Sequence, residues 1–295
     1  MSPTSKLILQ LVFGALGVVI SLGWLTRRAT DPREAFTWAR AYRVEVTPLN
    51  RAMIVRFVRV SITLRGLGAV SGLVLGSLFD RGLGLRTSTG VGFWVWVLLG
   101  WIAGGAWAEA RYVPPNRAAD MTASLTPRRV ADYLPAAVHW APPAGAALTS
   151  GVAVLGLVAG PPAQPEVFGV ATPSDLWLLI VGSMIITALA LWGEQRVVDR
   201  RQPAAHPDVT AADDAIRAST VHLLGAGSTA AILLLGAHAT GGVLGPRQLP
   251  FGMRGWVPVL FILGALFSSR YMVYRAWRVR RPRPNSEAPA AVPPR

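Results

Sequence analysis

The feature that most constrains the fold is a series of seven long apolar runs separated by short polar segments. Each run approaches the roughly 20 residues that an α-helix needs to cross a hydrocarbon core of about 30 Å. Hydrophobic residues make up 52% of the chain and charged residues only 15%, a composition that argues against an ordinary soluble domain. We therefore predict an all-α integral membrane protein, a seven-helix transmembrane bundle that forms one polytopic domain over residues 1–280. The predicted spans lie near residues 7–25, 61–79, 91–107, 145–159, 176–192, 222–238 and 255–272.

The positions of the arginines predict the orientation of these spans. The chain carries 29 basic and 15 acidic residues, a net charge of +14. The segments 26–60, 108–144, 193–221 and 273–295 together hold 22 of the arginines. Basic residues collect on the cytoplasmic side of membrane proteins, so we expect the N-terminus outside and the C-terminus in the cytoplasm.

The same charge distribution indicates which molecules the protein is expected to contact. The arginines are spread over four segments that carry no recognisable nucleic-acid-binding fold, so we expect no nucleic-acid partner. We expect the lipid bilayer as the environment, with the surplus charge attracting anionic headgroups of the inner leaflet. The Pro-rich tail at 281–295 is predicted to be disordered and cytoplasmic.

Tryptophan provides a second guide to the membrane edges, because indole rings favour the interface. Most tryptophans fall at the ends of predicted spans, for example Trp94 and Trp177 at outer edges and Trp107, Trp140 and Trp192 at inner ones. The absence of cysteine excludes disulfides and thiolate chemistry. Arginine outnumbers lysine 28 to 1, which we attribute to a GC-rich bacterial genome, and we predict a multi-pass protein of the bacterial plasma membrane. We interpret the first apolar run as a retained anchor rather than a cleaved signal peptide.

Three stretches that begin at Thr47, Thr126 and Thr210 are typical of helix starts, each leading into an outgoing span. They suggest an anchor helix followed by three helix-and-hairpin units. In the first unit, residues 51–59 place apolar side chains on one helical face and arginines on the other, as in a helix lying in the membrane interface. The alternating pattern at 58–65 would also suit a strand, but an unpaired strand entering hydrocarbon would leave its backbone unsatisfied.

Small residues recur every four positions in several spans. Gly68, Gly72 and Gly76 follow this spacing in the second span, and Gly100 and Gly104 follow it in the third. Such spacing lets helix backbones approach closely. It predicts a compact bundle, with sliding or hinge surfaces as the alternative interpretation.

Motifs for catalysis or cofactor binding are missing from the sequence. There is no P-loop, the single lysine is Lys6, and there is no HExxH motif. The four histidines are too scattered to indicate a metal site. We therefore expect no cofactor and no metal, and we regard enzymatic activity as the weaker hypothesis.

No acidic residue lies in the middle of a predicted span, and Glu109 and Glu194 lie at predicted inner edges, each two positions after a tryptophan. The simpler interpretation is a membrane boundary, where each glutamate pairs with Arg111 or Arg196 in the headgroup region.

A functional interpretation would combine each glutamate with a histidine, Glu109 with His139 and Glu194 with His222, at a cytoplasmic vestibule that binds a cation or relays a proton. Arg65 and Arg270, about one turn inside the membrane, are further candidates for contact with an anionic headgroup or substrate.

Three classes of function remain open. We favour a permease-like membrane component of a transport system, energised by a separate ATPase or other membrane subunit. The first alternative is a scaffold, a regulator or an immunity protein. The second is an intramembrane or lipid-modifying enzyme, whose most suitable polar residues are Ser183 and Thr187 on one face of the fifth span.

Overall fold

The computed structural model describes residues 29–83, 91–111, 128–159, 173–200, 206–244 and 259–268, together with Gly23 and Arg27. Within these ranges every regular element is helical and no strand occurs. The labelled helices are α2 (Pro32–Ala41), α3 (Arg51–Leu83), α4 (Val91–Ala110), α5 (Val130–Tyr133), α6 (Ala136–His139), α7 (Ala141–Val158), α8 (Pro173–Val198) and α9 (Pro207–Leu244). A further apolar helix covers Val259–Ser268.

Four helical segments are long and apolar enough to cross a membrane, namely Arg51–Leu78, Ala136–Val158, Pro173–Val198 and Pro207–Thr240. They contain or overlap four of the predicted spans, and α4 covers a fifth. The prediction of an all-helical chain with several helices apolar and long enough to span a membrane is thus confirmed for the described residues. The predicted span at 7–25 lies outside them, and the one at 255–272 is described only over Val259–Ser268.

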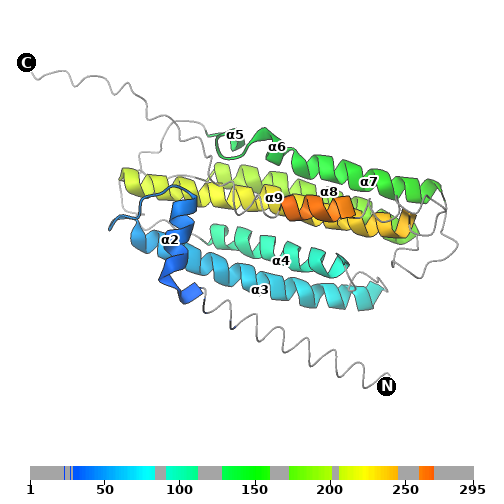
Figure 1. Cartoon of the computed structure of the whole chain (residues 1–295), viewed down its shortest axis with the longest axis horizontal. Helices are drawn as coiled ribbons and strands as arrows, with labels where there is room; N and C mark the ends of the chain where they lie inside the picture. Colours follow the sequence, from blue (N-terminus) through cyan, green and yellow to red (C-terminus); the bar gives the residue numbers. More distant parts are fainter. Residues whose placement is uncertain are drawn as a thin grey trace, which may run out of the picture.

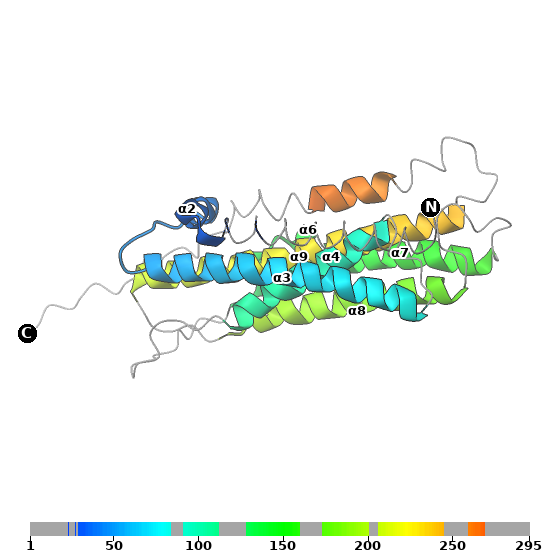
Figure 2. The ribbon, with the colours of Figure 1, turned by 90° about the horizontal axis from the view of Figure 1, so that it is seen from below.

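Helix α9 is the centre of the bundle, contacting α4, α7 and α8 (Figure 1). In its most apolar stretch 83% of the residues are buried, against 22–33% in the other three candidate spans. Helix α3 packs mainly on α4, and α7 packs on α8. Seen at 90° to the first view, α8 lies on the side of the bundle away from α2 and the Val259–Ser268 helix (Figure 2). The chain therefore forms an α3–α4 hairpin beside a three-helix unit of α7, α8 and α9.

One end of this bundle collects the arginines. The starts of α3 and α9 and the ends of α4 and α8 lie together there, and we call it the basic end (Figure 1). The short helix α2 runs across the bundle near this end (Figure 1). Exposed arginines of the basic end are Arg51, Arg56, Arg59, Arg111, Arg129 and Arg196.

The glycine spacing in α3 and α4 has the predicted packing role. A Cβ added at Gly68 would meet the carbonyl oxygen of Gly100, and one added at Gly72 would meet that of Trp96. Likewise, a Cβ at Gly104 would meet the Leu64 carbonyl oxygen. Only glycine allows such close backbone approach, so these residues determine the register of the α3–α4 pair.

Exposed tryptophans lie near both ends of the apolar helices. Trp94 and Trp107 are exposed on α4, and Trp177 and Trp192 on α8. At 1.5 Å per residue, each pair is separated by about 20 Å along its helix. Exposed indoles near both ends of an apolar helix are typical of the two membrane interfaces, although each pair spans less than the roughly 30 Å of a hydrocarbon core.

The predicted helix starts are only partly correct. Thr47 precedes α3, but the helix begins at Arg51, after a turn in which Asn50 Oδ1 accepts the Thr47 N–H at 2.9 Å. Thr210 lies inside α9, which begins at Pro207, where proline needs no hydrogen-bond partner. Thr126 lies outside the described residues.

The amphipathic segment at the start of α3 is also not a separate interfacial helix. It continues without a break into the apolar part of α3, and the rejection of a strand at 58–65 is confirmed. The apolar face of the segment packs on protein rather than on lipid headgroups, because α2 and α9 cover it. Its core consists of Met53, Ile54, Phe57 and Val58 with Ala35, Ala39, Ala212 and Ile216.

The three predicted units differ in how they lead into the bundle. Helices α3 and α9 are continuous, whereas α7 is preceded by the short helices α5 and α6. Pro135 lies between α5 and α6, where the missing N–H of proline interrupts a helix, whereas Pro142 belongs to the first turn of α7, where proline is tolerated. The repeat itself stays a prediction.

Candidate functional site

A cluster of charged side chains lies inside the basic end, where α4 and α8 meet α9. Arg200 Nη1 lies 2.5 Å from Glu109 Oε1, and Arg200 Nη2 lies 2.5 Å from Asp213 Oδ1. Asp213 Oδ2 accepts from Arg217 Nε at 3.0 Å, and the Thr220 hydroxyl donates to Glu109 Oε2 at 3.2 Å. We call these five residues the polar cluster. The cluster joins three helices, namely α4, α9 and the end of α8. Its charges alternate in the order Glu109, Arg200, Asp213 and Arg217.

Arg217 is the most buried member, with a side chain that is 0% exposed. Its Nη1 donates to the carbonyl oxygens of Val197, Val198 and Arg200, at 3.3, 3.1 and 2.5 Å. The last carbonyls of a helix have no partner within it and carry partial negative charge. One guanidinium can donate hydrogen bonds to several of these carbonyls at once. Arg217 of α9 therefore caps the C-terminal end of α8.

The location of both glutamates corrects the boundary interpretation. Glu109 is 4% exposed and Glu194 is fully buried, so neither lies in headgroup water beside Arg111 or Arg196. Helices α4 and α8 present these carboxylates toward α9, and the exposed positions at their ends are taken by tryptophans such as Trp192.

The one glutamate–histidine contact among the described residues differs from both predicted pairs. His139 Nδ1 lies 2.6 Å from Glu194 Oε2, while Glu109 contacts Arg200 and Thr220 instead. The two predicted pairings are therefore wrong, because α6 brings His139 to α8 rather than to α4.

The Glu194 carboxylate is enclosed by small and apolar groups on its other side. A Cβ added at Gly225 would lie 3.0 Å from Glu194 Oε1 and 3.2 Å from Leu134 Cδ2. Oε1 is buried and has no hydrogen-bond partner among the described residues. His139 is 29% exposed, so this pair joins a buried carboxylate to a ring that reaches the surface.

A second polar group lies between α3 and α9. The Tyr42 ring is 6.4 Å from the His222 ring, and the Ser219 side chain hydrogen-bonds to Tyr42. Burial raises the pKa of Tyr42, against opposing effects of Ser219 and the Arg65 charge. Arg65 Nε and His222 Nδ1 are buried without a hydrogen-bond partner among the described residues. Arg65 therefore faces the protein interior at Nε, whereas Arg270 lies outside the described residues.

A third contact ties α5 to α9. The Tyr133 hydroxyl donates to Asp214 Oδ1 at 3.1 Å, and Arg128 Nη1 lies 3.3 Å from the same oxygen. Burial, followed by the Asp214 charge, raises the pKa of Tyr133 well above its usual range. The phenol therefore remains a hydrogen-bond donor at physiological pH.

The polar cluster was not recognised from the sequence, although one signal was present. Asp213 and Arg217 have the i, i+4 spacing of a helical ion pair, which predicts a contact along one helix. No pattern in the sequence around Arg200 indicates that its side chain contacts two carboxylates, one on α4 and one on α9.

The two residues suggested for an enzyme, Ser183 and Thr187, both donate their hydroxyl hydrogen bonds to backbone carbonyls of α8. Ser183 donates to the Ile180 carbonyl at 2.9 Å, and Thr187 donates to the Ser183 carbonyl at 2.9 Å. Among the described residues, no group of three or more His, Cys, Asp or Glu side chains is placed to hold a metal ion.

No family model, no curated protein and no solved structure matches this chain.

Proposed function

We propose that this chain is a seven-span protein of the bacterial plasma membrane, with the basic end in the cytoplasm and the N-terminus outside. The concentration of arginines at one end supports this orientation, and the two levels of exposed tryptophan support the placement of the bundle in a membrane. Reporter fusions after the predicted spans test it. If a C-terminal reporter that works only outside the cytoplasm proves active, the proposed orientation is wrong.

Within that membrane, we propose a permease-like role for the bundle. The observation that carries this proposal is the polar cluster, which bridges the α3–α4 hairpin and the three-helix unit through Glu109 and Arg200. Charged groups buried near a membrane interior are costly and are typical of functional sites.

The two units have different contacts along their length, which suits relative movement. At the basic end, a buried core joins Ile102 of α4 to Val197 of α8 and Leu223 of α9. Toward the opposite end, the buried core contains only residues of α7, α8 and α9, among them Leu179. Separation of the units at the basic end would break the Glu109–Arg200 contact and expose the core that joins Ile102 to Leu223. Many transporters change access by rocking one such unit against another.

A separate subunit would supply energy, since the sequence has no P-loop of its own. The basic end, with α2 and the short helices α5 and α6, would be its docking face.

Cysteine accessibility tests the opening, because the natural chain has no cysteine. Leu223→Cys reports on the contact between α4 and α9. Leu179→Cys is the control, because Leu179 is also a buried leucine, with 5% exposure against 3% for Leu223. In inside-out native vesicles supplied with ATP, we expect a membrane-impermeant maleimide to label Leu223→Cys. Labelling should increase when Glu109→Gln is added, while Leu179→Cys remains protected.

Equal protection of both cysteines in both backgrounds would contradict the permease-like role and favour a rigid scaffold. Affinity purification from native membranes tests the energising subunit separately. A stoichiometric ATPase is expected, and its absence would remove that part of the proposal alone.

A further inference from the structure

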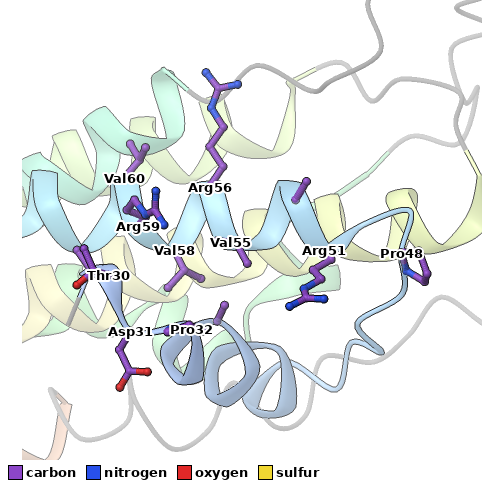
Figure 3. A pocket seen from close by; sticks show the side chains of 13 residues that line it. Thr30, Asp31, Pro32, Pro48, Arg51, Val55, Arg56, Val58, Arg59 and Val60 are labelled. Carbon is purple, nitrogen blue, oxygen red and sulfur yellow. The ribbon is translucent and has the colours of Figure 1, made fainter. Parts of the chain in front are cut away.

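A groove of about 610 Å³ lies between α2 and the first turns of α3 (Figure 3). Its walls are mostly aliphatic and include Ala35 of α2 and Val55 and Val58 of α3. Arg51, Arg56 and Arg59 also line it, against a single acidic residue, Asp31. The groove therefore combines an apolar wall with a basic rim.

The basic side chains at the rim are exposed. Arg51 lies over the Phe36 ring, with its Cζ 5.9 Å from the ring centroid, which keeps the guanidinium beside α2. Arg59 projects near Thr30 in Figure 3, and Arg56 points away from α2. The Asp31 carboxylate caps α2 by accepting the Arg33 N–H at 2.8 Å. Two guanidinium groups thus face the groove from α3.

The register of α3 on α4 gives the depth of the groove. Gly68 lies against Gly100 and Leu64 against Gly104, so in this antiparallel pair Ser61 is level with Trp107. Trp107 is exposed and is predicted to mark the inner membrane edge. The groove therefore starts at the headgroup level, at Val60, and extends about 14 Å further, to Arg51, at 1.5 Å per residue.

We propose that this groove binds one anionic diacyl phospholipid of the inner leaflet. The phosphate would lie between Arg59 and Arg51, and the glycerol and first methylenes would lie along Val58 and Val60, toward the membrane. The volume is within the range of small-ligand sites, and the charge complements a phosphate rather than a zwitterion. The inference rests on the proposed orientation of the basic end, but not on transport.

Lipid retention by the purified full-length chain tests the proposal. Native mass spectrometry in detergent would compare phosphatidylglycerol with phosphatidylcholine. We expect one phosphatidylglycerol to be retained selectively. The double variant Arg51→Gln/Arg59→Gln should bind it about thirtyfold more weakly, from the usual contribution of two arginines near a charged surface.

A matched control removes the same charge elsewhere on the basic end. Arg129 and Arg196 are exposed and do not line the groove, so Arg129→Gln/Arg196→Gln should retain the lipid as the wild type does. The variant Ala52→Trp keeps every charge but fills the groove, and it should lose the lipid. All three variants change exposed positions, and unchanged melting temperatures would verify that they fold.

Equal loss in both double variants would overturn the proposal in favour of diffuse attraction. Normal retention by Ala52→Trp, or equally tight binding of soluble glycerol phosphate, would overturn it as well. Because neither the ATPase nor substrate movement enters this measurement, its result is independent of the permease-like role.

Discussion

Arg217 Nε lies 3.0 Å from Asp213 Oδ2, one turn earlier on α9, and both side chains are buried. Asp213 also contacts Arg200, so one carboxylate holds two guanidinium groups that belong to different parts of the chain. This carboxylate is the central charge of the polar cluster.

Neutralising that carboxylate should destabilise the protein strongly. Asp213→Asn leaves Arg217 buried without its counter-charge, and we expect a loss of about 3–5 kcal/mol in the free energy of unfolding. Denaturation in detergent followed by circular dichroism measures it. The control Asp199→Asn, at an exposed position of the same end, should change it by less than about 0.5 kcal/mol. Similar effects of the two variants would show that the cluster contributes little.

The α3–α4 contact should be sensitive to a single methyl group. Gly72→Ala places a Cβ against the Trp96 carbonyl and should cost about 1–3 kcal/mol as the helices separate. Gly182→Ala is the matched control, since a Cβ there meets nothing within 4 Å, and higher helix propensity should leave it equally or more stable. Melting temperatures in detergent compare the two, and a Gly72→Ala variant as stable as Gly182→Ala would contradict the close packing.

The His139–Glu194 contact should show coupling in a double-mutant cycle. His139→Leu leaves the buried carboxylate without its partner, and we expect a cost of about 1–3 kcal/mol. Adding Glu194→Gln removes the stranded charge and should recover most of that cost. Strictly additive effects on unfolding would mean that the two side chains do not interact.

Ionisation of Tyr133 should lower the free energy of unfolding at alkaline pH. Because the folded-state pKa is raised, the folded protein keeps the phenol proton, and the unfolded chain loses it above about 10.0. The stability due to this group is therefore present below pH 10.0 and declines as the pH rises beyond it.

In Tyr133→Phe, stability near neutral pH should fall by about 1 kcal/mol through loss of the Asp214 hydrogen bond. Its decline above pH 10.0 should be shallower than in the wild type. Some decline should remain, since the pKa of Tyr42 is raised too. Parallel pH profiles of the two proteins would contradict the shift.

The helical class, the apolar segments able to span a membrane and the glycine faces that allow close helix packing can all be predicted from the sequence. These properties are local, because hydropathy over about 20 residues and a glycine every fourth position can be read along one helix. The same reasoning recognised the amphipathic start of α3, but it could not tell whether lipid or protein would cover the apolar face.

The partners of the buried charges became clear only from the packing of the helices. Glu109 and Glu194 have nearly the same sequence context, yet one contacts Arg200 and the other His139. The difference arises because α4 and α8 approach α9 from different directions, and α6 supplies a histidine only to α8. Charge pairing across helices depends on rotation and register about α9, and neither quantity is encoded in any single segment.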